Sequence, residues 1–132
     1  MTKEDRLLLI KDLSARLPYG VGIEHIKSGM RGVLHELKVY PKYDDDDNIF
    51  DCICHTDFFG DGDSFDISEF KPYLFPLSSM TEEQRTSHNF LKHSAYANPI
   101  KLIDWYKKNH FDYMGIIPKD LALDATNKNI YD

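Results

Sequence analysis

Residues 33–40 read VLHELKVY, and this stretch decides the fold class. Along it, one set of side chains alternates with another: Val33, His35, Leu37 and Val39 with Leu34, Glu36, Lys38 and Tyr40. Successive side chains of an extended chain point to opposite faces of a sheet. A repeat with a period of two therefore predicts a β-strand here.

Strand patterns continue on both sides of this stretch. Short apolar and aromatic runs occupy residues 21–26, 49–59, 65–67 and 71–77, and glycine-rich turns or a loop separate most of them. Within the last run, Pro72 and Pro76 disfavour helix in the residues that precede them. Several short strands joined by tight turns predict a small antiparallel sheet or a partly open barrel over residues 20–77.

Helical patterns flank this β unit. Thr2 caps a predicted helix at about residues 3–17, in which Ile10, Leu13 and Leu17 recur at helical spacing. A second predicted helix spans about 81–95, and a third about 99–110. The second carries a thin apolar stripe of Ser87, Phe90, Leu91, Ser94 and Ala95. The chain therefore reads as one α+β domain, 1–132, with an N-terminal helix and two C-terminal helices that we expect to pack on the sheet.

The starts of the two C-terminal helices are marked by capping signals. Thr81 with Gln84 forms a capping box, and Asn98-Pro99 places proline at the first helical position. In the last helix, Leu102, Ile103 and Tyr106 share one face, which we expect to pack on the sheet. Residues 119–132 are expected to form a short helical turn and a frayed tail.

Bulk properties predict an ordinary globular protein of the cytoplasm. The chain has 132 residues, of which 42% are hydrophobic, and no apolar run approaches the length that crosses a bilayer. The first residues show no secretory signal pattern. We therefore expect Cys52 and Cys54 to be reduced, buried thiols.

Acidic residues are concentrated in the middle of the chain. The formal net charge is −6, and residues 44–69 contain no Lys or Arg but ten acids: Asp44, Asp45, Asp46, Asp47, Asp51, Asp57, Asp61, Asp63, Asp66 and Glu69. This balance argues against nucleic-acid binding, which needs a basic surface. We expect Asp44, Asp45, Asp46, Asp47, Asp61 and Asp63 to contribute to a surface for a basic protein partner.

Three separated segments carry a family resemblance. They are LSARLPYGV at residues 13–21, KPYLFPLSSMTEE at 71–83, and HFDY at 110–113 with LAL at 121–123. Together they resemble a group of short proteins of gut anaerobic bacteria and their prophages or other mobile elements. The resemblance implies no activity, cofactor or active site. Phe75 stands where that group usually has arginine, so any role of that arginine would be absent here.

Metal motifs fail on their spacing. With Glu69 as the last ligand of a calcium loop, Phe58, Gly60 and Gly62 would occupy ligand positions. Cys52 and Cys54 supply half of a tetrahedral zinc site, and on a strand His55 points to the opposite face. The sequence therefore predicts no metal site and no cofactor.

Catalytic motifs are also missing from the sequence, which contains no nucleophile elbow, phosphate-binding loop or zinc-protease helix. We expect no catalytic residue and a non-catalytic protein-interaction module, an accessory protein of a prophage or mobile element. The alternative is a small metal-dependent hydrolase that uses acids of residues 51–69 with His35 or His55. An acidic mimic of nucleic acid is a third reading, and Trp105 with Tyr113 is an alternative binding surface. The oligomeric state and the partner stay open.

Overall fold

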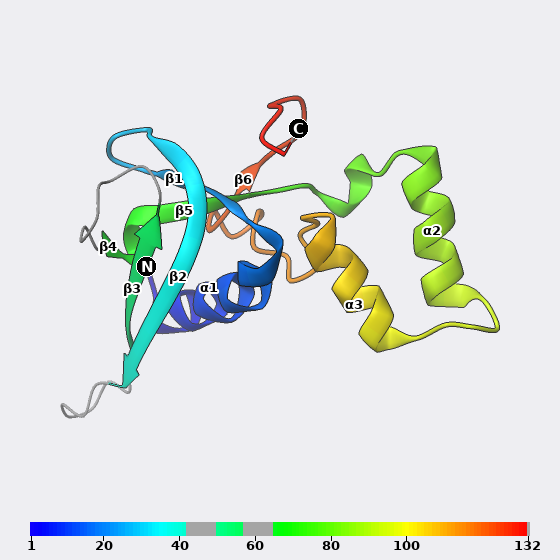
Figure 1. The fold of residues 1–132 in the computed structure, drawn as a ribbon, viewed down its shortest axis with the longest axis horizontal. Helices are drawn as coiled ribbons and strands as arrows, with labels where there is room; N and C mark the ends of the chain where they lie inside the picture. The colour runs from blue at the N-terminus through cyan, green and yellow to red at the C-terminus, as the bar shows by residue number, and fades with distance from the viewer. Residues whose placement is uncertain (42–49, 57–64, 132) are drawn as a thin grey trace.

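The computed structural model describes residues 1–41, 50–56 and 65–131, and its α+β architecture confirms the predicted fold class (Figure 1). The helices are α1 (Lys3–Arg16), α2 (Glu82–His93) and α3 (Pro99–Lys108). The strands are β1 (Gly22–His25), β2 (Arg31–Pro41), β3 (Phe50–Thr56), β4 (Phe65–Asp66), β5 (Phe70–Leu74) and β6 (Leu123–Asp124). Short 3-10 helices lie at η1 (Leu17–Tyr19), η2 (Ile67–Glu69) and η3 (Leu77–Ser79).

The strands form one sheet in the order β4-β3-β2-β1-β5-β6. Neighbours from β4 to β5 are antiparallel, as the sequence predicts, whereas β6 runs parallel to β5. The register is shifted between Leu34 and Glu36 on β2, where the strand pairs with β3. Such an irregularity bends a strand and increases its twist, which suits the long, curved β2 of Figure 1.

The core lies between α1 and the sheet. Thr2 begins α1, because its hydroxyl oxygen accepts a hydrogen bond from the Asp5 amide at 3.0 Å. Leu9 and Leu13 of α1 are then fully buried against the strands. The remaining fully buried members of this core are Val21, Ile23, Ile67, Phe70, Leu74 and Ile116.

The two C-terminal helices form a hairpin that projects from one end of the molecule (Figure 1). The predicted caps are present: Thr81 with Gln84 at α2, and Asn98 with Pro99 at α3. However, α2 lies against α3 and buries none of its residues, and the principal contacts of α3 are with α2 and α1. The expectation that the two helices pack on the sheet is therefore wrong. Ile103 is 41% exposed, which contradicts its predicted burial.

The C-terminal segment is ordered rather than frayed, so the prediction for residues 119–132 is also wrong over the described part. After α3, Phe111 forms a parallel bridge with Phe75, and the chain then adds β6 to the sheet edge. Near its end, Tyr131 accepts a hydrogen bond from the Gly22 amide at 3.0 Å and donates to the Tyr73 carbonyl. These contacts tie the tail to β1 and β5.

Over the described ranges, no helix is both long enough and apolar enough to span a bilayer.

Candidate functional site

Most of the predicted acidic surface lies outside the described residues. This applies to Asp44, Asp45, Asp46, Asp47, Asp61 and Asp63, and also to Asp57 and the failed calcium register around it. The described backbone places Cys52 and Cys54 on β3, opposite Val39 and Leu37 of β2. The burial and redox state of the two thiols stay predictions.

Two acids of the same segment serve the fold. Arg6 of α1 donates two hydrogen bonds to the Asp66 carboxylate, at 2.8 and 2.6 Å, and these bonds hold the pKa of Asp66 far below its usual range. Asp66 also caps η2, and Glu69 accepts a hydrogen bond from the Asp66 amide at 2.9 Å. The Asp66 carboxylate therefore joins η2 to α1, the Glu69 carboxylate completes the capping box of η2, and at least this end of the acidic segment is structural.

The hydrolase alternative finds no support among the described residues. Among residues 1–39 and 65–131, whose side chains the structure describes, no three His, Cys, Asp or Glu side chains come together as a metal site would require. Asp51, Asp57, Asp61, Asp63 and the side chain of His55 lie outside that part of the chain. His35 and Asp66 lie on different strands, separated by β3 in the sheet order.

Trp105 and Tyr113, the alternative surface, are engaged in internal contacts. Trp105 stacks on Phe111 with ring centroids 5.4 Å apart, and Tyr113 stacks on Tyr106 at 5.7 Å. The Arg16 guanidinium lies over the Tyr113 ring at 5.1 Å. The two side chains are half-buried and join α3 to the rest of the molecule, so they are poor candidates for an open binding face.

A buried polar cluster lies where α1 meets the exit of α3. Arg16 and Asp12 are fully buried and paired at 2.6 Å, and Arg16 also donates to the Phe111 carbonyl at 2.6 Å. Burial raises the pKa of Asp12, although the hydrogen bond from Arg16 opposes this. The pair is closed off from solvent and joins α1 to the segment after α3, so we interpret it as structural.

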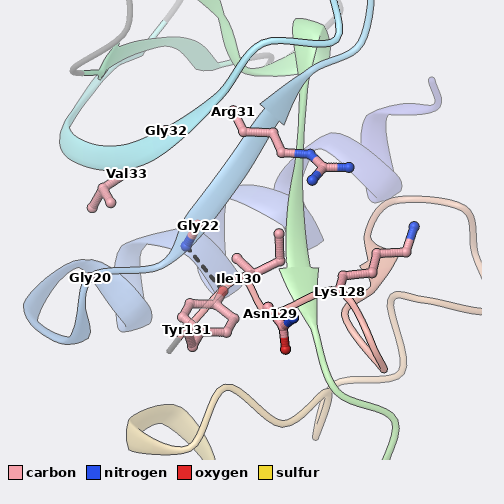
Figure 2. A pocket seen from close by; sticks show the side chains of 9 residues that line it. All are labelled: Gly20, Gly22, Arg31, Gly32, Val33, Lys128, Asn129, Ile130 and Tyr131. Carbon is pink, nitrogen blue, oxygen red and sulfur yellow. Dashed lines mark hydrogen bonds between the residues drawn. The ribbon is translucent and has the colours of Figure 1, made fainter.

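A shallow groove lies beside this cluster, between β1, β2 and the tail (Figure 2). Its volume is about 320 Å³, and its cations are Arg31 and Lys128, which both lie over the Tyr73 ring. Arg31 is also paired with Glu24 at 3.3 Å. Glu24 therefore offsets the charge of Arg31, and Lys128 is the cation of the groove for which no ion pair is seen among the described residues.

The hairpin carries the clearest feature of the described surface. Phe90, Tyr96 and Ile100 are 54%, 78% and 75% exposed, and they come from the end of α2, the turn and the start of α3. We call these three residues the hairpin tip. The rings of Phe90 and Tyr96 are stacked with centroids 6.2 Å apart. Large apolar side chains gathered on an exposed surface are typical of binding sites.

Hydrogen bonds hold the tip in one shape. The Ser94 amide and hydroxyl both donate to the Phe90 carbonyl, and the Ser94 hydroxyl oxygen accepts from the Tyr96 amide at 3.1 Å. Asn98 then caps α3 by accepting from the Ile100 amide at 3.0 Å. The turn that displays Tyr96 beside Phe90 is therefore held by hydrogen bonds between residues close in sequence.

Aromatic contacts fix the hairpin internally. His88 of α2 is hydrogen bonded to the Tyr106 hydroxyl at 2.6 Å, and its ring lies 5.9 Å from that of Trp105. Desolvation, with smaller contributions from nearby cations, lowers the pKa of His88 and favours a neutral ring at this contact. The face of α2 that carries His88 is thus occupied by α3, and the face that carries Phe90 is left exposed.

Sequence reasoning missed the hairpin tip because it assigned Phe90 and Leu91 to one apolar stripe. Adjacent residues on a helix are about 100° apart, so a neighbouring helix that covers one of the two side chains can leave the other exposed. Leu91 is half-buried, whereas Phe90 is not. The few apolar residues of α2 were the available signal that it contacts little besides α3.

Comparison of the chain with models of protein families, with curated proteins and with solved structures finds no match.

Proposed function

We propose that the protein is a non-catalytic protein-interaction module that engages its partner through the hairpin tip. The supporting observation is the exposed cluster of Phe90, Tyr96 and Ile100 on a hairpin that projects from the fold. Aromatic side chains are enriched among the residues that contribute most to protein–protein binding. Following the sequence resemblance, we propose an accessory role for a prophage or mobile element, in the cytoplasm.

The energetics of α2 favour this function over a purely structural role for the helix. None of its residues is buried, so it adds little hydrophobic stabilisation to the core. An exposed phenylalanine and tyrosine contribute still less, and each increases the risk of aggregation. A conformationally fixed apolar surface of this kind is well suited to entering a pocket on another protein.

Site-specific photo-crosslinking tests the proposal. A photoreactive phenylalanine analogue replaces Tyr96, and in a second protein it replaces Lys11, which is exposed on α1. In cells of the native host, we expect discrete protein adducts at position 96 and none of the same size at position 11. Unlabelled wild-type protein should compete for the adduct, and the Phe90→Ser/Tyr96→Ser variant should not. Equal labelling at both positions would refute the assignment of the tip.

A further inference from the structure

The hairpin tip is surrounded by basic residues and lacks acids. Residues 84–103 contain Arg85, Lys92 and Lys101 but no Asp or Glu, although acids outnumber bases over the whole chain. Lys92 lies in the last turn of α2, and Lys101 lies in the first turn of α3. The two lysines therefore flank the tip from both helices.

These lysines have no carboxylate partner among the residues that the structure describes. Some other bases of the molecule do have one: Lys71 pairs with Asp120 at 2.9 Å, and Lys107 pairs with Asp104 at 3.7 Å. Lys92 and Lys101 are both exposed and are free to meet a charge on another molecule. An apolar centre with unpaired cations at its edge resembles half of a protein interface, with its core and polar rim.

We propose that the partner of the hairpin tip is an acidic protein surface with an apolar pocket. This inference rests on the proposed function and adds the chemistry of the partner. Phe90, Tyr96 and Ile100 enter the pocket, and carboxylates at its edge face Lys92 and Lys101. Complementary charge of this kind mainly accelerates encounter and selects the partner, while the apolar side chains supply the affinity.

A second copy of this chain fits the tip poorly. A two-fold contact between two tips would bring the lysines of both copies together, because such an interface uses the same patch twice.

An anionic membrane fits less well than a protein. Recognition of anionic lipids typically uses clusters of about four to eight Lys or Arg residues. The stretch around the tip contains three, and the start of α2 carries the acids Glu82 and Glu83. The charge that is present is therefore better matched to a few carboxylates at fixed positions.

Peptide selection provides the first test, because it needs no known partner. A phage-displayed library of random peptides is selected on the folded, full-length protein and counter-selected on the Phe90→Ser/Tyr96→Ser variant. We expect the surviving peptides to combine Asp or Glu with an aromatic or large aliphatic residue. Survivors with no enrichment in acids would overturn the inference.

Charge reversal provides the second test. For a selected peptide, Lys92→Glu/Lys101→Glu should weaken binding at least about tenfold, and raising the salt from about 50 to about 300 mM should weaken wild-type binding. The matched control is Lys11→Glu/Lys119→Glu, which makes the same change in net charge at exposed positions outside the hairpin and should change binding less than about twofold. Equal effects of the two pairs would overturn the inference.

The outcomes separate this inference from the proposed function. Binding that depends on Phe90 and Tyr96 but not on the two lysines would leave the interaction module intact and refute the acidic partner. A library that yields no peptide dependent on the tip would count against both. Tip-dependent binding to phosphatidylserine vesicles, or tip-dependent dimers in sedimentation, would replace the acidic protein by a membrane or a second copy.

Discussion

The ring of Tyr131 lies flat on the imidazole of His110, with centroids 3.6 Å apart and planes 7° apart. Burial lowers the pKa of His110 to about 4, and the nearby Arg16 cation contributes. We predict that Tyr131→Ala raises the pKa of His110 toward 6.5, because it removes the ring that excludes water. Titration of the histidine signals by NMR measures this shift.

The control for this prediction is Tyr131→Phe. It keeps the ring but loses the hydrogen bonds to Gly22 and Tyr73. The pKa of His110 should stay low, while the free energy of unfolding falls by about 1–2 kcal/mol. A high His110 pKa in the phenylalanine variant would show that the hydroxyl, and not the ring, keeps the site dry.

Acidification should destabilise the fold through His110. The pKa of this side chain is about 4 in the folded protein and near 6.5 when unfolded, so the unfolded chain binds more protons between these values. The contribution of His110 to the free energy of unfolding is complete above pH 6.5 and is lost as the pH falls to 4. Urea unfolding at several pH values measures this loss.

The matched variant is His110→Asn, which cannot titrate. The backbone of His110 has φ 61°, a conformation that asparagine tolerates better than most residues. The variant should show a flatter pH dependence of stability between pH 6.5 and 4. An unchanged slope would mean that other groups, such as the carboxylate of Asp66, account for the acid sensitivity.

Breaking the buried Arg16–Asp12 pair should be costly. Arg16→Met leaves a fully buried carboxylate without its cation and the Phe111 carbonyl without its donor, and should cost about 3–5 kcal/mol. Asp12→Leu/Arg16→Met should cost less than the single Arg16 change, since no unpaired charge remains. Urea unfolding of Asp12→Leu, Arg16→Met and the double variant completes a double-mutant cycle. Additive losses in the free energy of unfolding would contradict coupling between the two residues.

Gly22 provides a test of tail docking. A Cβ atom at this position would lie 2.8 Å from Cγ2 of Ile130, closer than carbon atoms pack. Gly22→Ala should therefore displace the tail and raise the pKa of His110. Adding Ile130→Ala should restore the low pKa, because it removes the clashing atom. NMR titration of both variants checks this, and a failure of the second change to rescue the first would place the clash elsewhere.

Exposure of Ile103 predicts a small effect of its truncation. Because Ile103 is 41% exposed, Ile103→Ala should lower the free energy of unfolding by less than about 1 kcal/mol. Leu74 is at the buried centre, so Leu74→Ala should lower it by about 2–5 kcal/mol. Thermal or urea unfolding compares the two. Equal losses would mean that α3 packs more tightly than the exposure of Ile103 indicates.

Local patterns predicted the fold class because each element carries its own signal. The alternation in residues 33–40 and the capping residues Thr81 and Asn98 act over a few positions, so the sequence alone shows them. The placement of α2 could not be predicted this way. Its apolar residues are compatible with packing on the sheet or on α3, and only the tertiary fold decides between them.

The contacts of the tail and of the buried ion pair were missed for a related reason. Arg16 and Phe111 are 95 positions apart, and Gly22 and Tyr131 are 109 apart. The residues next to a lysine, arginine or tyrosine in the sequence form no pattern that indicates a partner so far along the chain. The hairpin tip was missed because phenylalanine is usually a core residue. Phe90 is exposed because of where the tertiary fold places this part of α2.

These long separations also bear on how fast the chain folds. Arg16 joins α1 to the carbonyl of Phe111, and Tyr131 joins the C-terminal segment to the amide of Gly22 in β1. Contacts between distant residues must wait for large loops to close, which slows folding relative to proteins with local contacts. The hairpin, in contrast, has contacts within residues 81–108 and can form early. In a growing polypeptide, Arg16 of α1 therefore stays without its carbonyl partner until Phe111 has emerged.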